Sequence, residues 1–512
     1  MLCKKIKINL PIVVASLLKE EKTLNKINLK GTAIDSVFLT LARFIAALSG
    51  IVIAKLLSTE FTLQEYGTYS QANLIIGTVT SLTIMGLCDA TNYFYNAASD
   101  DEEKNRSIAT IFGIQYIIGV FAAVIIMIFQ IPIIHYFKND ELKKIIMFVA
   151  WMPVFENILP MLQVLFVSIG EARLIAVRNF FLSCARLIIV AVSCFITKEV
   201  YTIFFALLML DIFQVVIFKK LLSKHGYGID LKRFSVSLVP TILRFCIPMA
   251  IFVFVNSLNR DIDKYVIAFL TNTETLGIYS NAARLLPFDM FTASFITVLV
   301  PIITRQVKAN KDHDAFNSLR LFVKVCYYTT WVLVIGAIVN AKELMLFLYD
   351  EKYLVGLPIF IVYLLVDLIS LMGTTLVIVA KGKNNLLVLV SSLMLVLNFI
   401  FNIVSFKFLG LVGPAITTLF VTIVYTIIIL VLSTKMLNSS FWNLFEWKDF
   451  FAFLIELCIL SIVTMLLKKV FYQNNISYIV NFVVMYSFFV LSMLLINRNK
   501  LLKLFKQMNK LR

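Results

Sequence analysis

The sequence predicts an all-α polytopic membrane protein with about 14 transmembrane helices. Of its 512 residues, 60% are hydrophobic and only 15% are charged, and the mean hydropathy is +0.91. A soluble domain would be about half apolar and about a quarter charged. An internal repeat is the third observation, and it divides most of the predicted helices into two halves of six.

The apolar segments long enough to cross a bilayer form two series of six and a closing pair, at ~20 residues for each crossing. In chain order they are residues 31–57, 70–96, 108–129, 144–169, 175–196, 200–218, 244–270, 278–303, 321–339, 355–380, 386–408, 411–432, 450–467 and 478–496.

The segment before the first span contains lysines, a short apolar stretch and no small-residue cleavage pattern. We interpret it as an amphipathic segment at the membrane surface rather than as a cleaved signal peptide. The predicted organisation is therefore a cytoplasmic N-terminus (1–30), a six-helix bundle (31–218), a cytoplasmic linker (219–243), a second six-helix bundle (244–432), two additional helices (450–496) and a basic cytoplasmic tail (497–512).

The net charge of +17 is unevenly distributed along the chain. Roughly three times as many Lys and Arg residues fall in the segments on the side of the termini as in the opposite loops. The positive-inside rule therefore predicts that both termini are cytoplasmic. We interpret the charge as a determinant of orientation and of attraction to anionic lipid, not as a nucleic-acid surface.

The sequence carries no sign of metal or cofactor chemistry. Its seven cysteines include no CxxC pair, and its three histidines are far apart. The Asp261-Ile262-Asp263 pattern resembles the metal-binding carboxylates of sugar transferases, but a single DxD is a weak signal. We expect no metal, no resident cofactor and no enzymatic activity.

The repeat is visible in two segments 210 residues apart, Gly67 to Ala72 (GTYSQA) and Gly277 to Ala282 (GIYSNA). The ends of the fourth and tenth spans have the same separation, with Asn157 opposite Asp367. Because six spans is an even number, both halves cross the membrane in the same direction, and the pseudo-axis lies along the membrane normal.

A third match, the tripeptide Val-Ile-Ala at 52–54 and 266–268, has a shift of 214 and implies that the connection after the first span is four residues longer than its counterpart. This register places the charged segment 259–264 inside the seventh helix, although hydropathy favours a loop. Arg260 would lie over Ala46, and Asp263 over Ser49.

Cationic side chains inside the spans are candidates for binding an anionic substrate, because each costs at least ~2.5 kcal/mol to insert and normally faces a cavity or a partner. Arg43 lies on a small and polar face with Ser36, Thr40, Ala47 and Gly50, and a similar stripe contains Asn256, Arg260 and Asp263. Further candidates are Arg186, Arg284 and Lys324. The alternative for each is local pairing, or snorkelling to an interface.

Buried carboxylates are candidates for coupling transport to a cation. Glu156 and Asp367 lie near the middle of spans paired by the repeat, where desolvation favours proton exchange, and simple pairing with arginines is the alternative. The candidates for ion coupling are Asp35, Asp89, Glu156, Asp263 and Asp367. Pro287 would also turn the eighth helix beside charged residues, although a packing kink without function is equally consistent.

Three pairs of motifs together resemble a known family. They are residues 54–57 (AKLL) with 65–69 (EYGTY), 263–267 (DKYVI) with 276–282 (LGIYSNA), and 398–402 (NFIFN) with 410–415 (GLVGPA). They resemble the bacterial oligosaccharide repeat-unit (Wzx-type) flippases, which belong to the multidrug, oligosaccharidyl-lipid and polysaccharide exporter superfamily.

This resemblance implies two bundles that form a V-shaped (MATE-like) cleft, with two extra C-terminal helices, in a bacterial cytoplasmic membrane. It implies a substrate made of an oligosaccharide on a polyprenyl pyrophosphate, moved to the outer leaflet for capsule, O-antigen or related polymers. It also implies coupling to H⁺ or Na⁺, and a polysaccharide polymerase and chain-length proteins as partners. A drug or metabolite exporter, or a peptidoglycan-precursor flippase of the same superfamily, remains the alternative.

Overall fold

The computed structural model describes the backbone of residues 29–229, 231–474 and 477–511. The side chains of residues 29–44, 231, 289–294, 297, 298, 505 and 508–511 lie outside the described part, as does the whole N-terminal segment that we predict to be amphipathic. Throughout the described residues the regular structure is helical. Twelve of the described helices are long and apolar enough to cross a membrane, which agrees roughly with the predicted 14.

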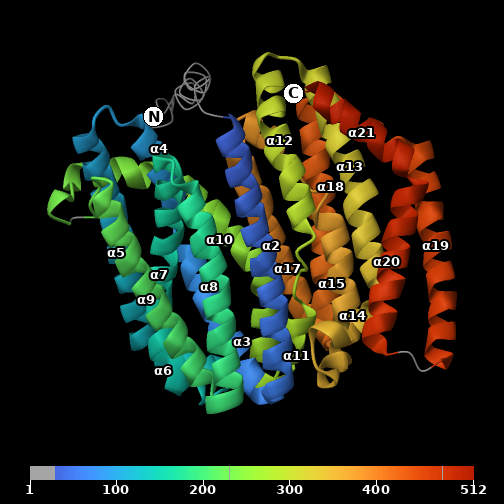
Figure 1. Cartoon of the computed structure of the whole chain (residues 1–512), viewed down its shortest axis with the longest axis horizontal. Helices are drawn as coiled ribbons and strands as arrows, with labels where there is room; N and C mark the ends of the chain where they lie inside the picture. Colours follow the sequence, from blue (N-terminus) through green and yellow to red (C-terminus); the bar gives the residue numbers. More distant parts are fainter. Residues whose placement is uncertain (1–28, 230, 475–476, 512) are drawn as a thin grey trace.

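The first half of the chain forms one group of helices, coloured blue to green in Figure 1. Its elements are α2 (Leu29–Glu60), α3 (Leu63–Thr83), α4 (Leu87–Ala97), α5 (Asp101–Ile128), α6 (Gln130–Phe137), α7 (Leu142–Ile169), α8 (Ala172–Val192), the π-helical turn η2 (Ser193–Thr197) and α9 (Val200–Lys224).

A connection with two short 3₁₀ turns, η3 (Leu231–Arg233) and η4 (Val236–Leu238), leads to the second group of helices. Its elements are α10 (Val239–Leu270), α11 (Thr273–Ala282), α12 (Asp289–Lys308), α13 (Asp312–Val339), α14 (Ala341–Leu348), η5 (Glu351–Gly356), α15 (Leu357–Ser370), α16 (Leu376–Ala380), α17 (Asn384–Leu409) and α18 (Val412–Met436).

A turn, η6 (Phe441–Leu444), connects to the closing helices α19 (Trp447–Gln473), α20 (Tyr478–Ile496) and α21 (Arg498–Leu511). These helices pack on the outer side of the second group (Figure 1). A buried ion pair fixes α19 there, with 2.7 Å between Lys468 Nζ and Glu343 Oε2. The Tyr472 hydroxyl donates to the same carboxylate. Breaking such a pair leaves an uncompensated charge, so α19 stays with the second group.

The two halves repeat with a constant shift of 210 at their first helices. Helices α2 and α10 both contain 32 residues, and two residues separate each of them from the next helix. The predicted four-residue difference between these connections is therefore wrong, and the register places Arg260 opposite Gly50 and Asp263 opposite Ile53. The prediction that residues 259–264 are helical is confirmed, because they lie within α10.

Both connections end in the same kind of helix cap, which explains their equal length. The Thr62 hydroxyl accepts from the Glu65 backbone N–H, while the Glu65 carboxylate accepts from the Thr62 N–H. In the second half the Asn272 side chain accepts from the Thr275 N–H at 2.9 Å. A Thr or Asn at this position satisfies an N–H that has no partner within the helix.

The two groups of helices meet where α3 crosses α11, at the end of the molecule opposite α21 (Figure 1). A Cβ atom on Gly67 would lie 2.1 Å from the Thr273 carbonyl oxygen, and one on Gly277 would lie 3.0 Å from the Gly67 nitrogen. The repeated glycines thus let the two helix backbones approach each other closely. At this crossing the Tyr66 hydroxyl also donates a hydrogen bond to the side-chain oxygen of Asn281.

Lysines from each half bind backbone carbonyls of the other half around this crossing. Lys138 Nζ donates to the Phe269 carbonyl at 2.8 Å, and Lys352 Nζ donates to the Phe61 carbonyl at 2.6 Å. Lys55 Nζ bonds the carbonyls of Leu346 and Tyr349. Carbonyls at the C-terminal end of a helix have no intrahelical partner, so these lysines satisfy them and join the halves.

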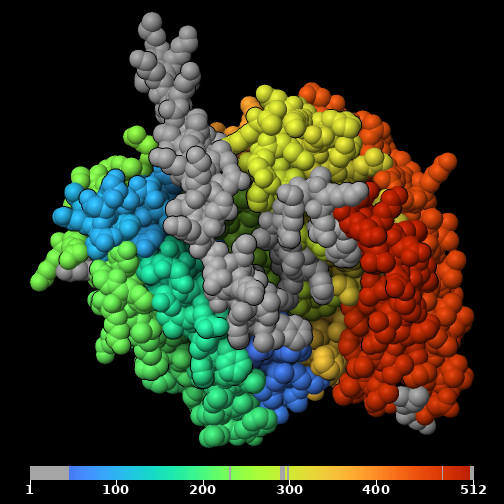
Figure 2. All heavy atoms as spheres, turned by 45° about the horizontal axis from the view of Figure 1, so that its top comes forward, coloured from blue at the N-terminus to red at the C-terminus, as the bar shows by residue number. Residues whose placement is uncertain are grey.

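At the opposite end α10 stays against the first group, where it contacts α4 and α5 and where Phe245 stacks on Tyr93 with 5.0 Å between the ring centroids. Helix α12 of the second group stands apart from α4 and α5 at this end (Figure 1). With this end turned forward by 45°, the described atoms of the first half (blue and green) and those of the second half (yellow to red) occupy opposite sides of the view (Figure 2). The architecture is therefore a V that is closed at the α3–α11 crossing.

Replacing Gly67 with alanine tests the crossing. The new methyl group would overlap the Thr273 carbonyl, so we expect destabilisation of ~1–3 kcal/mol. Gly77→Ala on the same helix is the control, because nothing lies within 4 Å of the position that a Cβ would take there. Thermal unfolding in detergent measures both variants, and equal stability of the two would contradict the close crossing.

Candidate functional site

A cavity of about 750 Å³ lies between the two halves of the molecule. Residues of α2 and α3 form one wall and residues of α10 and α11 form the other, with contributions from the segment after α11 and from α14 and α15. The lining consists of Ala46, Ala47, Gly50, Ile51, Ala54, Tyr66, Tyr69, Ser70, Asn73, Leu74, Gly77, Arg260, Asp261, Lys264, Ser280, Asn281, Ala283, Arg284, Leu285, Leu286, Pro287, Leu348, Tyr349, Asp367, Ser370 and Leu371.

The two walls differ sharply in charge. All three cations of the described lining, Arg260, Lys264 and Arg284, come from the second half. The repeat-equivalent positions in the first half are Gly50, Ala54 and Leu74, which line the same cavity. A positive wall therefore faces a small, neutral one.

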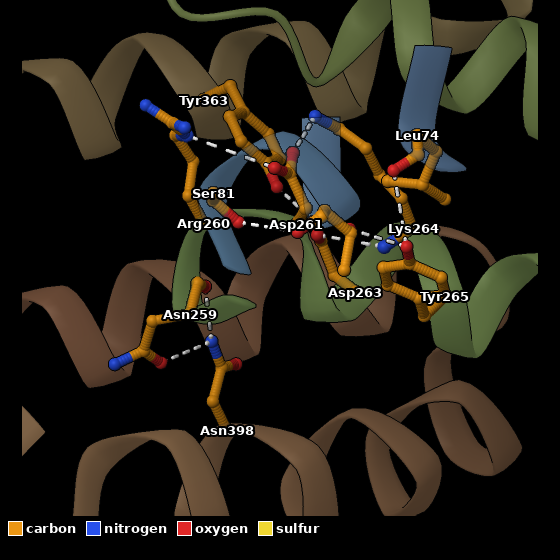
Figure 3. A network of polar contacts seen from close by, with 11 residues as sticks. Leu74, Ser81, Asn259, Arg260, Asp261, Asp263, Lys264, Tyr265, Tyr363 and Asn398 are labelled. Carbon is orange, nitrogen blue, oxygen red and sulfur yellow. Dashed lines mark hydrogen bonds and ion pairs between the residues drawn. The ribbon is translucent and has the colours of Figure 1, made fainter. Parts of the chain in front are cut away.

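Helix α10 presents a compact charged group to the cavity. Asp261 lies between the two cations, 2.6 Å from Lys264 Nζ and 3.9 Å from Arg260 Nε (Figure 3). The side chain of Arg260 is 63% exposed, so a ligand in the cavity can reach it. Because one carboxylate serves two cations, this group keeps a net positive charge.

Arg284 reaches the cavity because α11 ends just before it. The chain is not helical from residue 283 to residue 288, whereas the sequence predicts a continuous span over 278–303. Pro287 lies in this break, where it cannot supply a backbone N–H. Across the cavity, Gly50 has no side chain, and a Cβ there would lie 3.7 Å from the Arg284 guanidinium.

A buried carboxylate supports the broken backbone. Asp367 Oδ2 accepts a hydrogen bond of 3.1 Å from the Leu286 N–H, and only 4% of Asp367 is exposed. An N–H group released from a helix inside a membrane needs such an acceptor, because lipid offers none.

The first half contains a related arrangement at the position that the repeat predicts. The Asn157 side chain donates to the Thr83 hydroxyl at 2.7 Å and to the Thr80 carbonyl at 3.3 Å. Thr83 is the last residue of α3, directly before the interruption between α3 and α4. Asn157 and Asp367 thus both support the interrupted second helix of their half.

Two of the predicted site residues lie away from the cavity. Lys324 pairs with Glu446 and with Asp449, at 3.3 Å from the latter, beside α19. Asp263 is 1% exposed and accepts hydrogen bonds from the hydroxyls of Tyr279, at 2.6 Å, and Tyr363. It is not part of the cavity lining, because three residues advance the helix by about 300° and so turn its side chain about 60° from that of Arg260, toward the tyrosines of α11 and α15.

Other predicted residues lie behind the first wall or outside the described part. The Glu156 carboxylate accepts from Thr80 at 3.4 Å, and neither it nor Arg186 belongs to the lining. Asp89 is exposed in the first turn of α4. Arg43 and Asp35 lie on α2 at positions whose side chains are not described.

Sequence reasoning missed Lys264 as a site residue. It follows Arg260 by four positions, a spacing that places two side chains on one helix face. That spacing could have indicated the Arg260–Lys264 pair in place of the Arg260–Asp263 stripe. Asn73, which lies within α3, and Tyr349, which directly follows α14, gave no comparable signal.

Comparison with known proteins places this chain in a family. Residues 52–358 match the family model described as "Polysaccharide biosynthesis protein". The chain belongs to this family. A curated relative, the capsular polysaccharide biosynthesis protein CapF of Staphylococcus aureus, is 22% identical over 391 residues, which are 74% of this chain and 93% of CapF.

Solved structures of membrane transporters share the fold. The lipid II flippase MurJ in an inward closed conformation is 16% identical with a TM-score of 0.70, covering 91% of this chain and all of MurJ. An inward-facing multidrug resistance MATE family transporter has a TM-score of 0.62 at 14% identity, covering 77% of this chain and 94% of the transporter. These likenesses show that the chain has the fold of these transporters, and together with the family match they agree with the resemblance found in the sequence motifs.

The role of Asp367 as an acceptor can be tested by two substitutions. Asp367→Leu leaves the Leu286 N–H without a partner, and we expect it to destabilise the fold by ~1–3 kcal/mol. Asp367→Asn removes the charge but keeps an acceptor oxygen, so it should retain most of the stability. Thermal unfolding distinguishes the two, and equal losses would show that the charge, not the hydrogen bond, supports the break.

Proposed function

We propose that this protein moves a polyprenyl-pyrophosphate-linked oligosaccharide from the cytoplasmic to the outer leaflet for the synthesis of a surface polysaccharide. The observation that carries this proposal is the one-sided cavity, in which three cations face a neutral wall. Membership of the polysaccharide biosynthesis family and the transporter fold support it.

The chemistry of the cavity suits a pyrophosphate. Guanidinium groups bind phosphate oxygens through paired hydrogen bonds, and Lys264 adds a compact charge beside them. Because two anionic phosphates cannot enter hydrocarbon unaided, the cationic wall would replace their hydration during the crossing. The small residues Ala46, Ala47 and Gly50 leave room for hydrated sugars on the other side.

In this proposal the open end of the V, where α21 lies, faces the cytoplasm of a bacterium, and the α3–α11 crossing faces outward. The cycle would open that crossing and close the other end. Binding of a cation, H⁺ or Na⁺, would drive this cycle. Asp367 is a candidate for the cation site, because its hydrogen bond to the Leu286 N–H connects the break after α11 to α15. Polymerase and chain-length proteins would receive the delivered unit.

Similarity to MurJ supports a second candidate, the translocation of a lipid-linked peptidoglycan precursor. That substrate class shares the anionic head and the long tail, so the cationic wall suits it as well. Export of cationic drugs fits this cavity less well, because its three cations would repel such compounds.

A leaflet assay in proteoliposomes tests the proposal. A fluorescent polyprenyl-pyrophosphate oligosaccharide is incorporated, and an impermeant quencher reports how much is in each leaflet. Arg260→Ala combined with Arg284→Ala should slow transfer at least ~10-fold, since losing a charged hydrogen bond costs ~1.5–3 kcal/mol.

Lys324→Gln is the matched control, because it removes a cation that lies in ion pairs outside the cavity. It should transfer lipid at nearly the normal rate. Transfer by the double variant at the normal rate would contradict the proposed head-group site. Faster transfer of a peptidoglycan precursor than of the oligosaccharide lipid would favour the second candidate.

A further inference from the structure

A second, separate pocket lies on the outside of the wall formed by α3 and α10. This seam pocket has a volume of about 380 Å³. It is lined by Ile75, Thr78, Val79, Ile126, Phe129, Pro132, Ile133, Tyr136, Phe137 and Tyr265. Its residues come from both halves of the molecule, as do those of the central cavity.

Adjacent residues of the same helices point into the two spaces. On α3, Leu74 lines the cavity and Ile75 lines the seam pocket; on α10, Lys264 lines the cavity and Tyr265 lines the seam pocket. The positive wall and the seam pocket are therefore separated only by the thickness of these two helices.

The polar atoms at the floor of the seam pocket are satisfied among themselves. The Tyr265 hydroxyl lies 2.6 Å from the Thr78 hydroxyl and donates to the Leu74 carbonyl at 3.2 Å. The Tyr136 hydroxyl donates to the Tyr265 carbonyl at 2.8 Å. With these groups paired, the pocket offers a ligand apolar contact and almost no hydrogen bonding.

The surroundings of the pocket show which medium it opens to. Phe129, on its rim, is 55% exposed, and the neighbouring Ile128 and Ile131 are 68% and 75% exposed. Large apolar side chains with this exposure in a membrane protein face lipid tails. Helix α6, which carries part of the rim, lies near the closed end of the V (Figure 1), which the proposed orientation places in the outer leaflet.

We propose that the seam pocket binds the isoprenoid chain of the lipid-linked substrate in the outer-leaflet half of the membrane. This inference rests on the proposed function, because the chain is that of the substrate whose head occupies the cavity one helix away. The pyrophosphate of the substrate would lie on the cationic wall inside the cavity, and its isoprenoid chain would lie in the seam pocket on the outer side of α3 and α10.

The aromatic lining of the seam pocket favours an isoprenoid over a straight acyl chain. Aromatic rings are held in fixed positions around the pocket, with Tyr136 stacked on Phe269 at 5.8 Å and Phe137 tilted against Tyr265 at 6.4 Å. A chain with a methyl branch on every fourth carbon and with flat double bonds can lay these groups against the rings of the lining. A saturated chain has no such groups and would make fewer dispersion contacts with the rings.

The test fills the pocket and measures binding of the chain alone. Purified protein is titrated with neutral C55 polyprenol, which has no charged head, and binding is followed by native mass spectrometry. Ile133→Trp occupies the pocket and should weaken binding at least ~10-fold. Ile131→Trp, two residues away on the same helix and facing lipid, should bind as the unmodified protein does.

Arg260→Ala with Arg284→Ala should leave polyprenol binding unchanged, so that failure of this inference and failure of the head-group site are distinguishable. Unimpaired binding by Ile133→Trp, or no binding by the unmodified protein, would overturn the inference. So would displacement of the polyprenol by equimolar dioleoyl phospholipid.

A photoreactive benzophenone amino acid at position 133 gives a second readout that does not depend on the folding of the tryptophan variant. After irradiation in cells, an adduct with a polyprenyl lipid supports the site. An adduct with phospholipid alone would overturn it.

Discussion

The backbones of α3 and α11 cross so closely that a Cβ on Gly67 would overlap the Thr273 carbonyl, and a Cβ on Gly277 would crowd the Gly67 backbone. This contact determines most of what surrounds it. It fixes where the two halves touch, and the lysine-to-carbonyl bonds around it hold that end of the molecule shut. Beyond this crossing α10 continues along the first half, while α12 diverges from α4 and α5, and the cavity lies between the halves.

The repeat gives the two walls of this cavity the same backbone, and the sequence then makes them different. Equivalent positions carry Gly50 and Arg260, or Ala54 and Lys264, and they face each other across the same space. A symmetric pair of cationic walls would repel itself across a narrow gap, while a neutral wall of small residues lets the halves approach and leaves volume for a bulky ligand. Gly50 also makes room for Arg284.

Much of the fold could be predicted from the sequence, because the length of the apolar segments and the repeated glycine motif can be recognised without knowing any tertiary contact. The placement of residues 259–264 within a helix followed from the repeat against the evidence of hydropathy, and the structure confirms it. The site was harder to predict. The face of α10 that carries Arg260 depends on whether position 263 or position 264 points inward, and the tyrosines that bury Asp263 come from α11 and α15. Lys324 looked like a cleft cation because its partners, Glu446 and Asp449, are more than 120 residues away in sequence. Contacts of this kind leave no local pattern.

Access to the cavity from one end only is the central claim of this account, and thiol labelling tests it most directly. Ser280, which lines the cavity, is replaced by cysteine in a cysteine-free background, and a membrane-impermeant maleimide is applied to vesicles of each orientation. Ser99→Cys, exposed between α4 and α5 at the open end, reports the orientation of the vesicles. Without substrate, Ser280→Cys should react from the same side as Ser99→Cys and resist labelling from the other. Equal labelling from both sides, or faster labelling from the side of the α3–α11 crossing, would contradict the account.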